Sequence, residues 1–179
     1  MAKTYTLHVA GLTRELPICK INDHLDIAAF IMFSDVELTI ACAKALLKKC
    51  PDFDVILTAE AKGIPLAYEM SRQSGKQWIP ARKGVKGYMA DPVIVEDQSI
   101  TTAGKQKLVI DKKDLDYMNG KRILVVDDVI STGGSLHALD ALAARSSGTI
   151  VAQAAVLAEG DAAERKDIIF LEPLPLFAH

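Results

Sequence analysis

The chain has 179 residues, of which 50% are hydrophobic, and a formal net charge of −2 at pH 7. This is enough apolar material for one well-buried core, and the length fits a single domain spanning residues 1–179. The slightly acidic balance excludes a global attraction to nucleic acid or to an anionic membrane surface, so we expect neither as a partner.

Targeting and cysteine patterns favour a cytoplasmic protein. Polar residues interrupt the N-terminus too early for a signal-peptide core, and no apolar run approaches membrane-spanning length. Cys19, Cys42 and Cys50 are odd in number and lack zinc-site spacing, so neither a disulfide framework nor a zinc site is indicated. They are typical of small buried residues in a reducing cytosol.

The N-terminal part of the chain predicts a strap followed by a helix. Residues 1–26 mix short apolar runs with Gly, Pro and Asn, which favours an irregular strap or a small hairpin. Ser34 and Glu37 have the spacing of a capping box, and apolar residues then recur at helical intervals up to Lys48 and Lys49. We therefore expect a helix that is capped by Ser34.

The remaining chain alternates strands with helices. Residues 83–104 break this pattern, because they are polar and basic with little apolar periodicity, and they indicate a mobile excursion. Strand, helix, strand is the signature of a parallel sheet, so we expect a doubly wound α/β domain with a mainly parallel β-sheet flanked by helices. Strands are predicted at 55–57, 78–82, 107–110, 123–126, 150–157 and 168–171, and helices at 64–74 and 136–143.

The segment RILVVDDVISTGGS, residues 122–135, carries the clearest chemistry. It places Asp127 and Asp128 at the carboxyl end of a buried strand, which is where ligands bind in open α/β sheets. The turn that follows offers backbone N–H groups at a helix N-terminus, whose dipole favours an anion, and its glycines allow close approach. We expect it to bind a phosphate monoester through Ser131, Thr132, Gly133, Gly134 and Ser135.

The two carboxylates need a different partner. The segment lacks the G-x-x-x-x-G-K-[ST] pattern of a Walker A loop, and Asp127 and Asp128 would repel a phosphate that they faced. Adjacent strand side chains point to opposite faces, so we expect one carboxylate to reach the ligand while the other is turned by the strand end or serves a cation. Sugar hydroxyls and magnesium are natural partners. A plain turn with an acidic helix cap is the alternative.

The stretch VVDDVISTGGS resembles the phosphoribosyl-pyrophosphate motif of type I phosphoribosyltransferases, in which two acidic residues precede a phosphate loop. The resemblance implies that family's fold, with a flexible lid at 83–106 and a small hood made of residues 1–34 and the C-terminus. It implies that Asp127 and Asp128 are the catalytic carboxylates that hold the ribose hydroxyls. It also implies Mg²⁺ held mainly by the substrate, so no protein metal ligand is assigned.

The turn after the strand at 55–57 matches the family's pyrophosphate loop in position. Ala61, Lys62 and Gly63 share its small, basic and glycine-bearing character, although a plain strand-to-helix turn is the alternative. We therefore assign these three residues to pyrophosphate.

A basic cluster follows the strand at 78–82. The stretch ARKGVKGYM is similar to the Arg-Lys segment that opens the flexible loop in purine phosphoribosyltransferases. This similarity favours Arg82 and Lys86 as pyrophosphate ligands ahead of Lys83, whereas a solvated charged edge is the usual meaning of such a run. In several relatives this arm reaches the neighbouring subunit, which implies a homodimer.

Over nearly the whole chain the layout looks most like the adenine phosphoribosyltransferases. This implies purine salvage, in which the 5-phosphoribosyl group of phosphoribosyl pyrophosphate passes to a purine base, adenine first, with release of pyrophosphate. Asn22, whose amide carries a donor and an acceptor, and Ile130 are candidate base contacts. Phe30 and Phe33 could stack on a base or pack in the core.

Departures from the adenine pattern keep alternatives open. Adenine enzymes carry an aromatic residue and a glutamate in the lid, whereas this chain has TTA at 101–103 before Gly104. Xanthine enzymes resemble it at 21–22 and 60–61 but carry lysine in place of Gly160. A xanthine or guanine phosphoribosyltransferase, a non-catalytic sensor of phosphoribosyl pyrophosphate and a sugar-phosphate-binding domain of a larger assembly are the alternatives.

Overall fold

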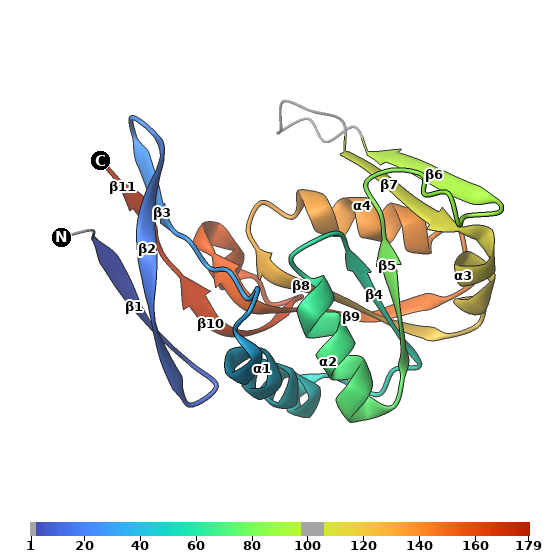
Figure 1. Cartoon of the computed structure of the whole chain (residues 1–179), viewed down its shortest axis with the longest axis horizontal. Coiled ribbons are helices and arrows are strands. Elements are labelled where there is room, and N and C mark those ends of the chain that lie inside the picture. The colour runs from blue at the N-terminus through green and yellow to red at the C-terminus, as the bar shows by residue number, and fades with distance from the viewer. Residues whose placement is uncertain (1–2, 98–105) are drawn as a thin grey trace.

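A five-stranded parallel sheet forms the centre of the computed structural model, which describes residues 3–97 and 106–179 (Figure 1). The strand order is β10-β9-β8-β4-β5, and every neighbouring pair is parallel. The expected mainly parallel sheet is therefore confirmed. Its strands are β4 (Val55–Ala59), β5 (Gln77–Ala81), β8 (Arg122–Ile130), β9 (Thr149–Glu159) and β10 (Ile169–Leu174).

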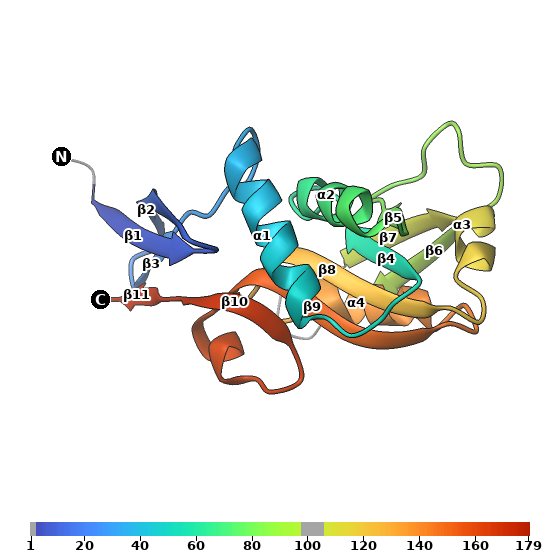
Figure 2. The same ribbon diagram turned by 90° about the horizontal axis from the view of Figure 1, so that it is seen from below.

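Helices cover both faces of this sheet (Figure 2). Along β8, Leu124 and Val126 join the apolar core on the side of α1 and α2, while Ile123 and Val125 join the core on the side of α4. A strand that is buried on both faces needs a continuous apolar run, which the sequence supplies here. The covering helices are α1 (Val36–Lys49), α2 (Ile64–Ser74) and α4 (Gly134–Ala143).

The start of α1 differs from the prediction in its cap. The Asp35 carboxylate accepts a hydrogen bond from the Leu38 backbone N–H at 3.1 Å, so Asp35 is the N-cap. Ser34 lies one residue outside the helix with a left-handed φ of 67°. The predicted Ser34 capping box is therefore wrong by one residue, because Ser34 serves the turn that enters the helix.

The N-terminal strap is more regular than the composition indicated. β1 (Thr4–Val9), β2 (Leu12–Asn22) and β3 (Leu25–Ala28) form antiparallel hairpins, and the C-terminal β11 (Leu176–Ala178) pairs with β3. Figure 1 shows β1 and the C-terminal β11 in this small sheet, beside the main sheet. We call β1, β2, β3 and β11 the hood. The hairpin alternative is confirmed, and the irregular strap is wrong.

The excursion predicted at 83–104 also contains regular structure. β6 (Pro92–Asp97) pairs antiparallel with β7 (Gln106–Asp111), and this ribbon packs beside α4. The apolar side chains Val93 and Val95 pack against the core on that side, which explains why the polar-looking stretch forms a strand. Residues 98–105, the C-terminal part of the predicted lid, lie outside the described residues.

Two short helical segments were not predicted. α3 (Lys112–Tyr117) joins β7 to β8, and the 3₁₀ helix η1 (Gly160–Glu164) follows β9. Both are too short to give a clear helical period, since each covers at most two turns. Within residues 3–97 and 106–179, no helix is long and apolar enough to cross a membrane.

Candidate functional site

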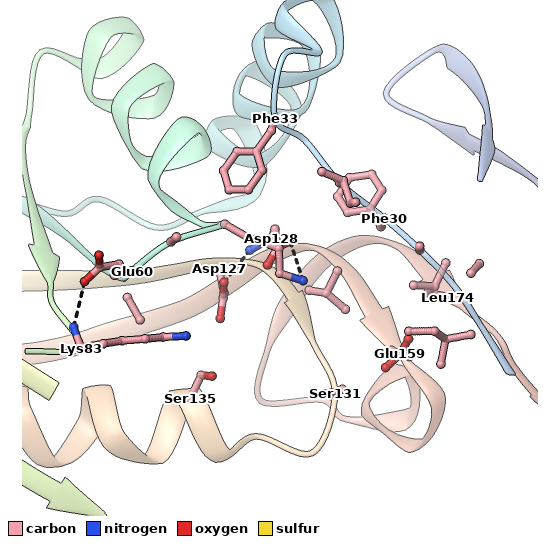
Figure 3. Close-up of a pocket in the computed structure, with 18 of the residues that line it drawn as sticks. Phe30, Phe33, Glu60, Lys83, Asp127, Asp128, Ser131, Ser135, Glu159 and Leu174 are labelled. Carbon is pink, nitrogen blue, oxygen red and sulfur yellow. Dashed lines mark hydrogen bonds and ion pairs between the residues drawn. The ribbon is translucent and has the colours of Figure 1, made fainter. Parts of the chain in front are cut away.

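The end of β8 brings the two acidic residues to the carboxyl edge of the sheet. Pairing with β9 continues beyond the predicted strand end, through Asp127 opposite Ala155 to Ile130 opposite Ala158. Because the strand stays regular, its side chains alternate: Asp127 is half-buried and Asp128 is buried. Both nevertheless line the same large cavity (Figure 3).

The Asp127–Asp128 pair is electrostatically strained in the free protein. Asp127 Oδ1 accepts a hydrogen bond from the Asp128 backbone N–H at 2.9 Å, and burial together with the Asp128 charge raises the pKa of Asp127 well above its usual range. Asp128 Oδ2 is buried and has no hydrogen-bond partner within the described residues. Lys62 Nζ lies 3.8 Å from this oxygen. The pair therefore lacks polar partners that a ligand could supply.

The loop between β8 and α4 forms a small cup. Gly133 is the N-cap of α4 and has a φ of 84°, a left-handed conformation that glycine adopts without a Cβ penalty. The cup has a volume of about 150 Å³, and the first backbone N–H groups of α4 lie at its loop. An anion placed here would meet N–H donors and the positive end of the helix dipole. All five residues predicted for the phosphate line this cup: Ser131, Thr132, Gly133, Gly134 and Ser135.

The loop between β4 and α2 lies next to the carboxylates because β4 pairs with β8. A Cβ at Gly63 would collide with Thr58 Oγ1 and would lie 3.2 Å from Asp127 Oδ1, so only glycine fits between these groups. Ala61 and Lys62 line the large cavity. The structure therefore brings the three residues predicted for pyrophosphate to the carboxylate pair.

The basic residues after β5 divide differently from the prediction. Arg82 is held by Glu60, with Nε 3.1 Å from Oε2, and its Nη1 donates to the Tyr88 hydroxyl at 2.7 Å. The Arg82 hydrogen bond lowers the pKa of Glu60 to about 2. Lys83, which the sequence ranked below Arg82 and Lys86, lines the cavity, and Figure 3 shows its side chain pointing into it.

Strand geometry explains why Lys83, and not Arg82, lines the cavity. Arg82 continues the edge of β5 through two backbone hydrogen bonds with Val109, so the next side chain, Lys83, points to the other side. Lys86 is half-buried, and neither Arg82 nor Lys86 is among the residues that line the described cavity. Their binding of pyrophosphate stays a prediction.

The large cavity, of about 790 Å³, has one apolar wall and one charged wall. Phe30 and Leu174 contribute buried apolar surface, and Phe33 is about half exposed at 48%. The rest of the lining carries acidic and basic groups together, which suits a ligand with both hydroxyl and anionic parts. The charged lining residues are Glu60, Lys62, Lys83, Lys107, Asp127, Asp128 and Glu159.

The two predicted base contacts, Asn22 and Ile130, are not among the residues that line the large cavity. Asn22 ends β2 in the hood, where its Oδ1 accepts a hydrogen bond from the His24 N–H at 2.8 Å and closes a turn. Ile130 is 2% exposed and lines only the small cup, whereas the preceding Val129 lines both the cup and the large cavity. The sequence analysis missed Val129, Glu159 and Leu174, because these residues lie beyond the strand ends predicted at 126, 157 and 171.

No cluster of three or more potential metal ligands occurs in the part of the chain that the structure describes. The acidic pair offers two adjacent carboxylates, one with an unpartnered buried oxygen. Magnesium commonly binds through one or two carboxylates and completes its coordination with substrate phosphates and water. The residues present therefore fit a magnesium ion that arrives with a phosphorylated substrate.

Comparisons with known proteins agree with this geometry. The family model described as "Phosphoribosyl transferase domain" matches residues 36–172. The adenine phosphoribosyltransferase of Thermotoga petrophila is 33% identical over 103 residues, which are 58% of this chain and 58% of that protein. The adenine phosphoribosyltransferase of Nocardia farcinica is 31% identical over 126 residues, which are 70% of this chain and 64% of that protein. The chain thus spans less than two thirds of these relatives.

Solved structures support the same fold. The adenine phosphoribosyltransferase of Thermoanaerobacter pseudethanolicus superimposes with a TM-score of 0.68 at 23% sequence identity, covering 79% of this chain and 84% of that one. The family match includes both the β4 loop and the β8 motif from which the resemblance was drawn. The chain therefore belongs to the phosphoribosyl transferase domain family.

Proposed function

We propose that this protein transfers the 5-phosphoribosyl group of phosphoribosyl pyrophosphate to a purine base, with adenine as the leading substrate, and releases pyrophosphate. One observation carries the proposal: the acidic pair on β8, half-buried Asp127 and buried Asp128, lies between two anion-suited loops and opens into one large cavity with an apolar wall. A phosphate and a pyrophosphate joined through a sugar, next to a flat base, match this order of surfaces.

Each part of the substrate has a proposed place. The 5-phosphate enters the cup at 131–135, and the ribose hydroxyls donate to Asp127 and Asp128. Pyrophosphate lies at the β4 loop, where Lys62 and Lys83 line the cavity, and Arg82, which pairs with Glu60, and Lys86 are further proposed ligands. These positions would hold the base nitrogen in line with the anomeric carbon, so the protein contributes orientation more than covalent chemistry.

Charge stabilisation is the second contribution. The bond to pyrophosphate would break with positive charge developing on the sugar, and the carboxylates of Asp127 and Asp128 are placed to stabilise it. Mg²⁺, when bound with the substrate, would neutralise the leaving pyrophosphate. The Oδ2 of Asp128, which has no hydrogen-bond partner within the described residues, supports a cation or a sugar hydroxyl beside this carboxylate.

Adenine leads because the relatives described above are named adenine phosphoribosyltransferases. The aromatic side chains of Phe30 and Phe33 on the apolar wall support a planar base, but they do not distinguish one purine from another. Xanthine or guanine transfer and a non-catalytic sensor remain the alternatives. The lid residues 101–103, on which the distinction from the adenine pattern rested, lie outside the described residues.

We further propose a homodimer in the cytoplasm, with residues 83–106 acting as the lid. Exposed apolar side chains on neighbouring helices, Val36 and Ile40 on α1 and Tyr68 on α2, support a contact with a second copy. The three cysteines are free thiols, which supports a reducing compartment.

The decisive experiment measures nucleotide formation by the purified protein with Mg²⁺, phosphoribosyl pyrophosphate and, separately, adenine, guanine, hypoxanthine and xanthine. We expect AMP and pyrophosphate in equal amounts from adenine. Turnover of another base alone would replace adenine by that base. If calorimetry showed phosphoribosyl pyrophosphate binding but no base reacted, the transferase proposal would fail and the sensor would take its place.

A further inference from the structure

The segment 29–34, between β3 and α1, forms part of the apolar wall of the large cavity and contains no helix or strand. Its side chains alternate: Phe30 and Met32 are buried at 4% and 2% exposure, whereas Ile31 and Phe33 are about half exposed. An irregular segment has fewer backbone hydrogen bonds to fix it than a strand has. Its position therefore depends on what holds its two ends.

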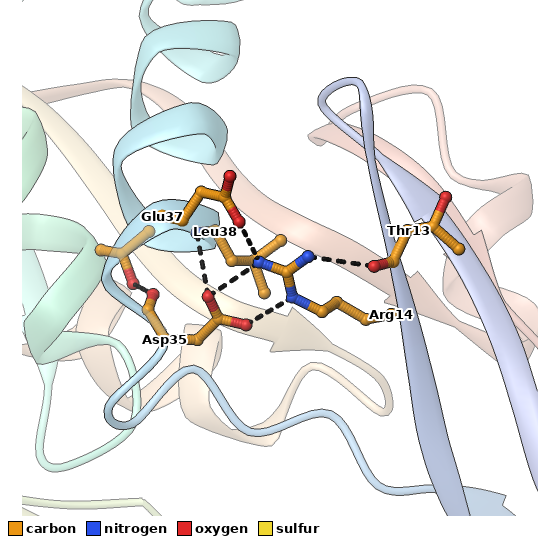
Figure 4. Close-up of polar contacts among 6 residues, drawn as sticks. Thr13, Arg14, Asp35, Glu37 and Leu38 are labelled. Atoms are coloured by element: carbon orange, nitrogen blue, oxygen red, sulfur yellow. Dashed lines mark hydrogen bonds and ion pairs between the residues drawn. The ribbon is translucent and has the colours of Figure 1, made fainter.

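Both ends of this segment are tied to the same hood strand, β2. At the first end, the Ala29 N–H donates to the Pro17 carbonyl at 2.9 Å. At the second end, Arg14 reaches from β2 to Asp35, the residue that caps α1 (Figure 4). β2 thus holds both ends of segment 29–34, one through a backbone hydrogen bond and the other through an ion pair.

The Arg14–Asp35 contact uses the whole guanidinium fork. Nε donates to Asp35 Oδ2 at 2.7 Å and Nη2 donates to Asp35 Oδ1 at 3.0 Å. Nη2 also donates to Glu37 Oε2 at 2.8 Å, and Nη1 donates to the Thr13 carbonyl at 3.0 Å. The Arg14 and Asp35 side chains are 27% and 26% exposed, so the pair is partly shielded, while Glu37 is 70% exposed. A bidentate pair fixes direction as well as distance.

We propose that Arg14 is a positioning residue for the purine base: through Asp35 it holds the wall 29–34 against the cavity, without touching the substrate. This inference rests on the transferase function proposed above and names the part of the site that the hood controls. The loops for phosphoribosyl pyrophosphate follow β4 and β8 and are fixed by the main sheet, so the Arg14–Asp35 pair does not set their positions.

The test compares steady-state kinetics of the wild type, Arg14→Gln, Asp35→Asn and the double variant. Asn still caps α1 but removes the carboxylate, so the helix start is retained. We expect each single variant to raise the KM for adenine about fivefold, with kcat and the KM for phosphoribosyl pyrophosphate little changed. The double variant should equal Arg14→Gln, because that substitution already removes the Arg14–Asp35 pair. Arg14→Lys should restore part of the adenine affinity.

Arg122→Gln is the matched control. Arg122 makes the same two-pronged contact with Asp54, with Nε 3.1 Å from Oδ2 and Nη2 2.9 Å from Oδ1. This pair lies at the amino ends of β4 and β8, whereas the cavity lies at their carboxyl ends. Its loss should leave the KM for adenine unchanged. An unchanged adenine KM in Arg14→Gln, or equal rises in the KM of both substrates, would overturn the positioning inference alone. Absence of turnover in the wild type would reject the transferase proposal, and adenine binding measured by calorimetry would then decide the inference, with no binding overturning it.

Discussion

The loops after β4 and β8 leave the same edge of the sheet from neighbouring strands, yet they offer an anion different things. The β8 loop carries hydroxyl groups and glycines, and its positive element is the N-terminus of α4. The β4 loop carries Glu60 and Lys62, and Lys83 from the next strand reaches the same cavity. One loop therefore works through fixed backbone dipoles, and the other through mobile charged side chains.

The difference corresponds to two kinds of phosphate. Backbone N–H groups at a helix N-terminus cannot follow a ligand, so the β8 cup suits a group that stays in place throughout a reaction. Long lysine side chains can move with a ligand, and their attraction acts over a longer range, so the β4 loop suits a group that must leave. The carboxylate pair on β8 lies between the two, where a sugar would join them.

The largest effect is expected at the junction of the loops. Asp128→Asn and Asp127→Asn should each lower kcat/KM by about 100-fold or more, since each removes a charge next to the proposed reacting carbon. Both variants should fold, because replacing one of two adjacent carboxylates relieves their repulsion. Steady-state assays would measure the loss of kcat/KM, and thermal unfolding would check that both variants fold.

Asp116→Asn is a suitable control for these variants. Asp116 is an exposed residue of α3 that pairs with Lys112 at 2.8 Å, away from the cavity. It should retain full activity. Wild-type affinity for phosphoribosyl pyrophosphate in both Asp127→Asn and Asp128→Asn would refute the proposed ribose contact.

A smaller effect should separate backbone geometry from charge. Gly133 and Gly120 both have positive φ, 84° and 69°, so alanine at either position should cost about 1–2 kcal/mol of folding free energy. Only Gly133 belongs to the β8 cup, so Gly133→Ala should also weaken phosphoribosyl pyrophosphate binding about tenfold. Calorimetric titration of both variants tests this. Equal affinities of Gly133→Ala and Gly120→Ala for phosphoribosyl pyrophosphate would show that the cup does not hold the ligand.

Much of the fold could be predicted because it depends on strong local patterns. The apolar run at 123–126 and the helical period of 64–74 each required one structure, and both formed. β6 was missed because its polar residues hide a short alternation, of which Val93 and Val95 supply the buried side. The hood strand β11 was not assigned as a strand, since it is three residues long and forms by pairing with the distant β3.

In the site, too, residues fixed by local sequence could be predicted, and residues fixed by long-range contacts could not. The motif at 125–135 carries its residues in one loop, so their meeting followed from strand and helix order alone. Lys83 was ranked below Arg82 because a run of basic residues does not reveal which side chain faces the cavity. That choice depends on the pairing of Arg82 with Val109 and with Glu60, which are remote in sequence. Asn22 was chosen for its amide alone, and the hood turn in which that amide accepts the His24 N–H could not be predicted from the sequence.

Removing the β4-side charges should sharpen the contrast between the loops. Lys83→Gln and Lys62→Gln should each raise the KM for phosphoribosyl pyrophosphate severalfold, and the loss should be greatest at low salt because these side chains are exposed. Gly133→Ala should show no such salt dependence. Lys44→Gln, at an exposed position on α1, is the control and should match the wild type. Salt-independent losses at both lysines would contradict the charge-based interpretation.

The smallest effect concerns protons on the carboxylate pair. Burial and Asp128 raise the pKa of Asp127, so the folded protein holds this proton more tightly than the unfolded chain does. The resulting stabilisation is present below about pH 4 and is lost as pH rises through the raised pKa. The contribution of Asp127 to the free energy of unfolding, measured with urea on the free protein, should therefore fall as pH rises through this window. Asp127→Asn should remove this fall.

Lys62 connects this proton to the comparison of the two loops. Its charge, beside the acidic pair, lowers the pKa of Asp127, so the β4 loop already acts on the β8 carboxylates in the free protein. Lys62→Gln should extend the falling window to higher pH, because the proton is then held more tightly, whereas Lys44→Gln should leave it unchanged. Identical pH profiles for Lys62→Gln and the wild type would mean that the two loops are electrostatically independent until a ligand joins them.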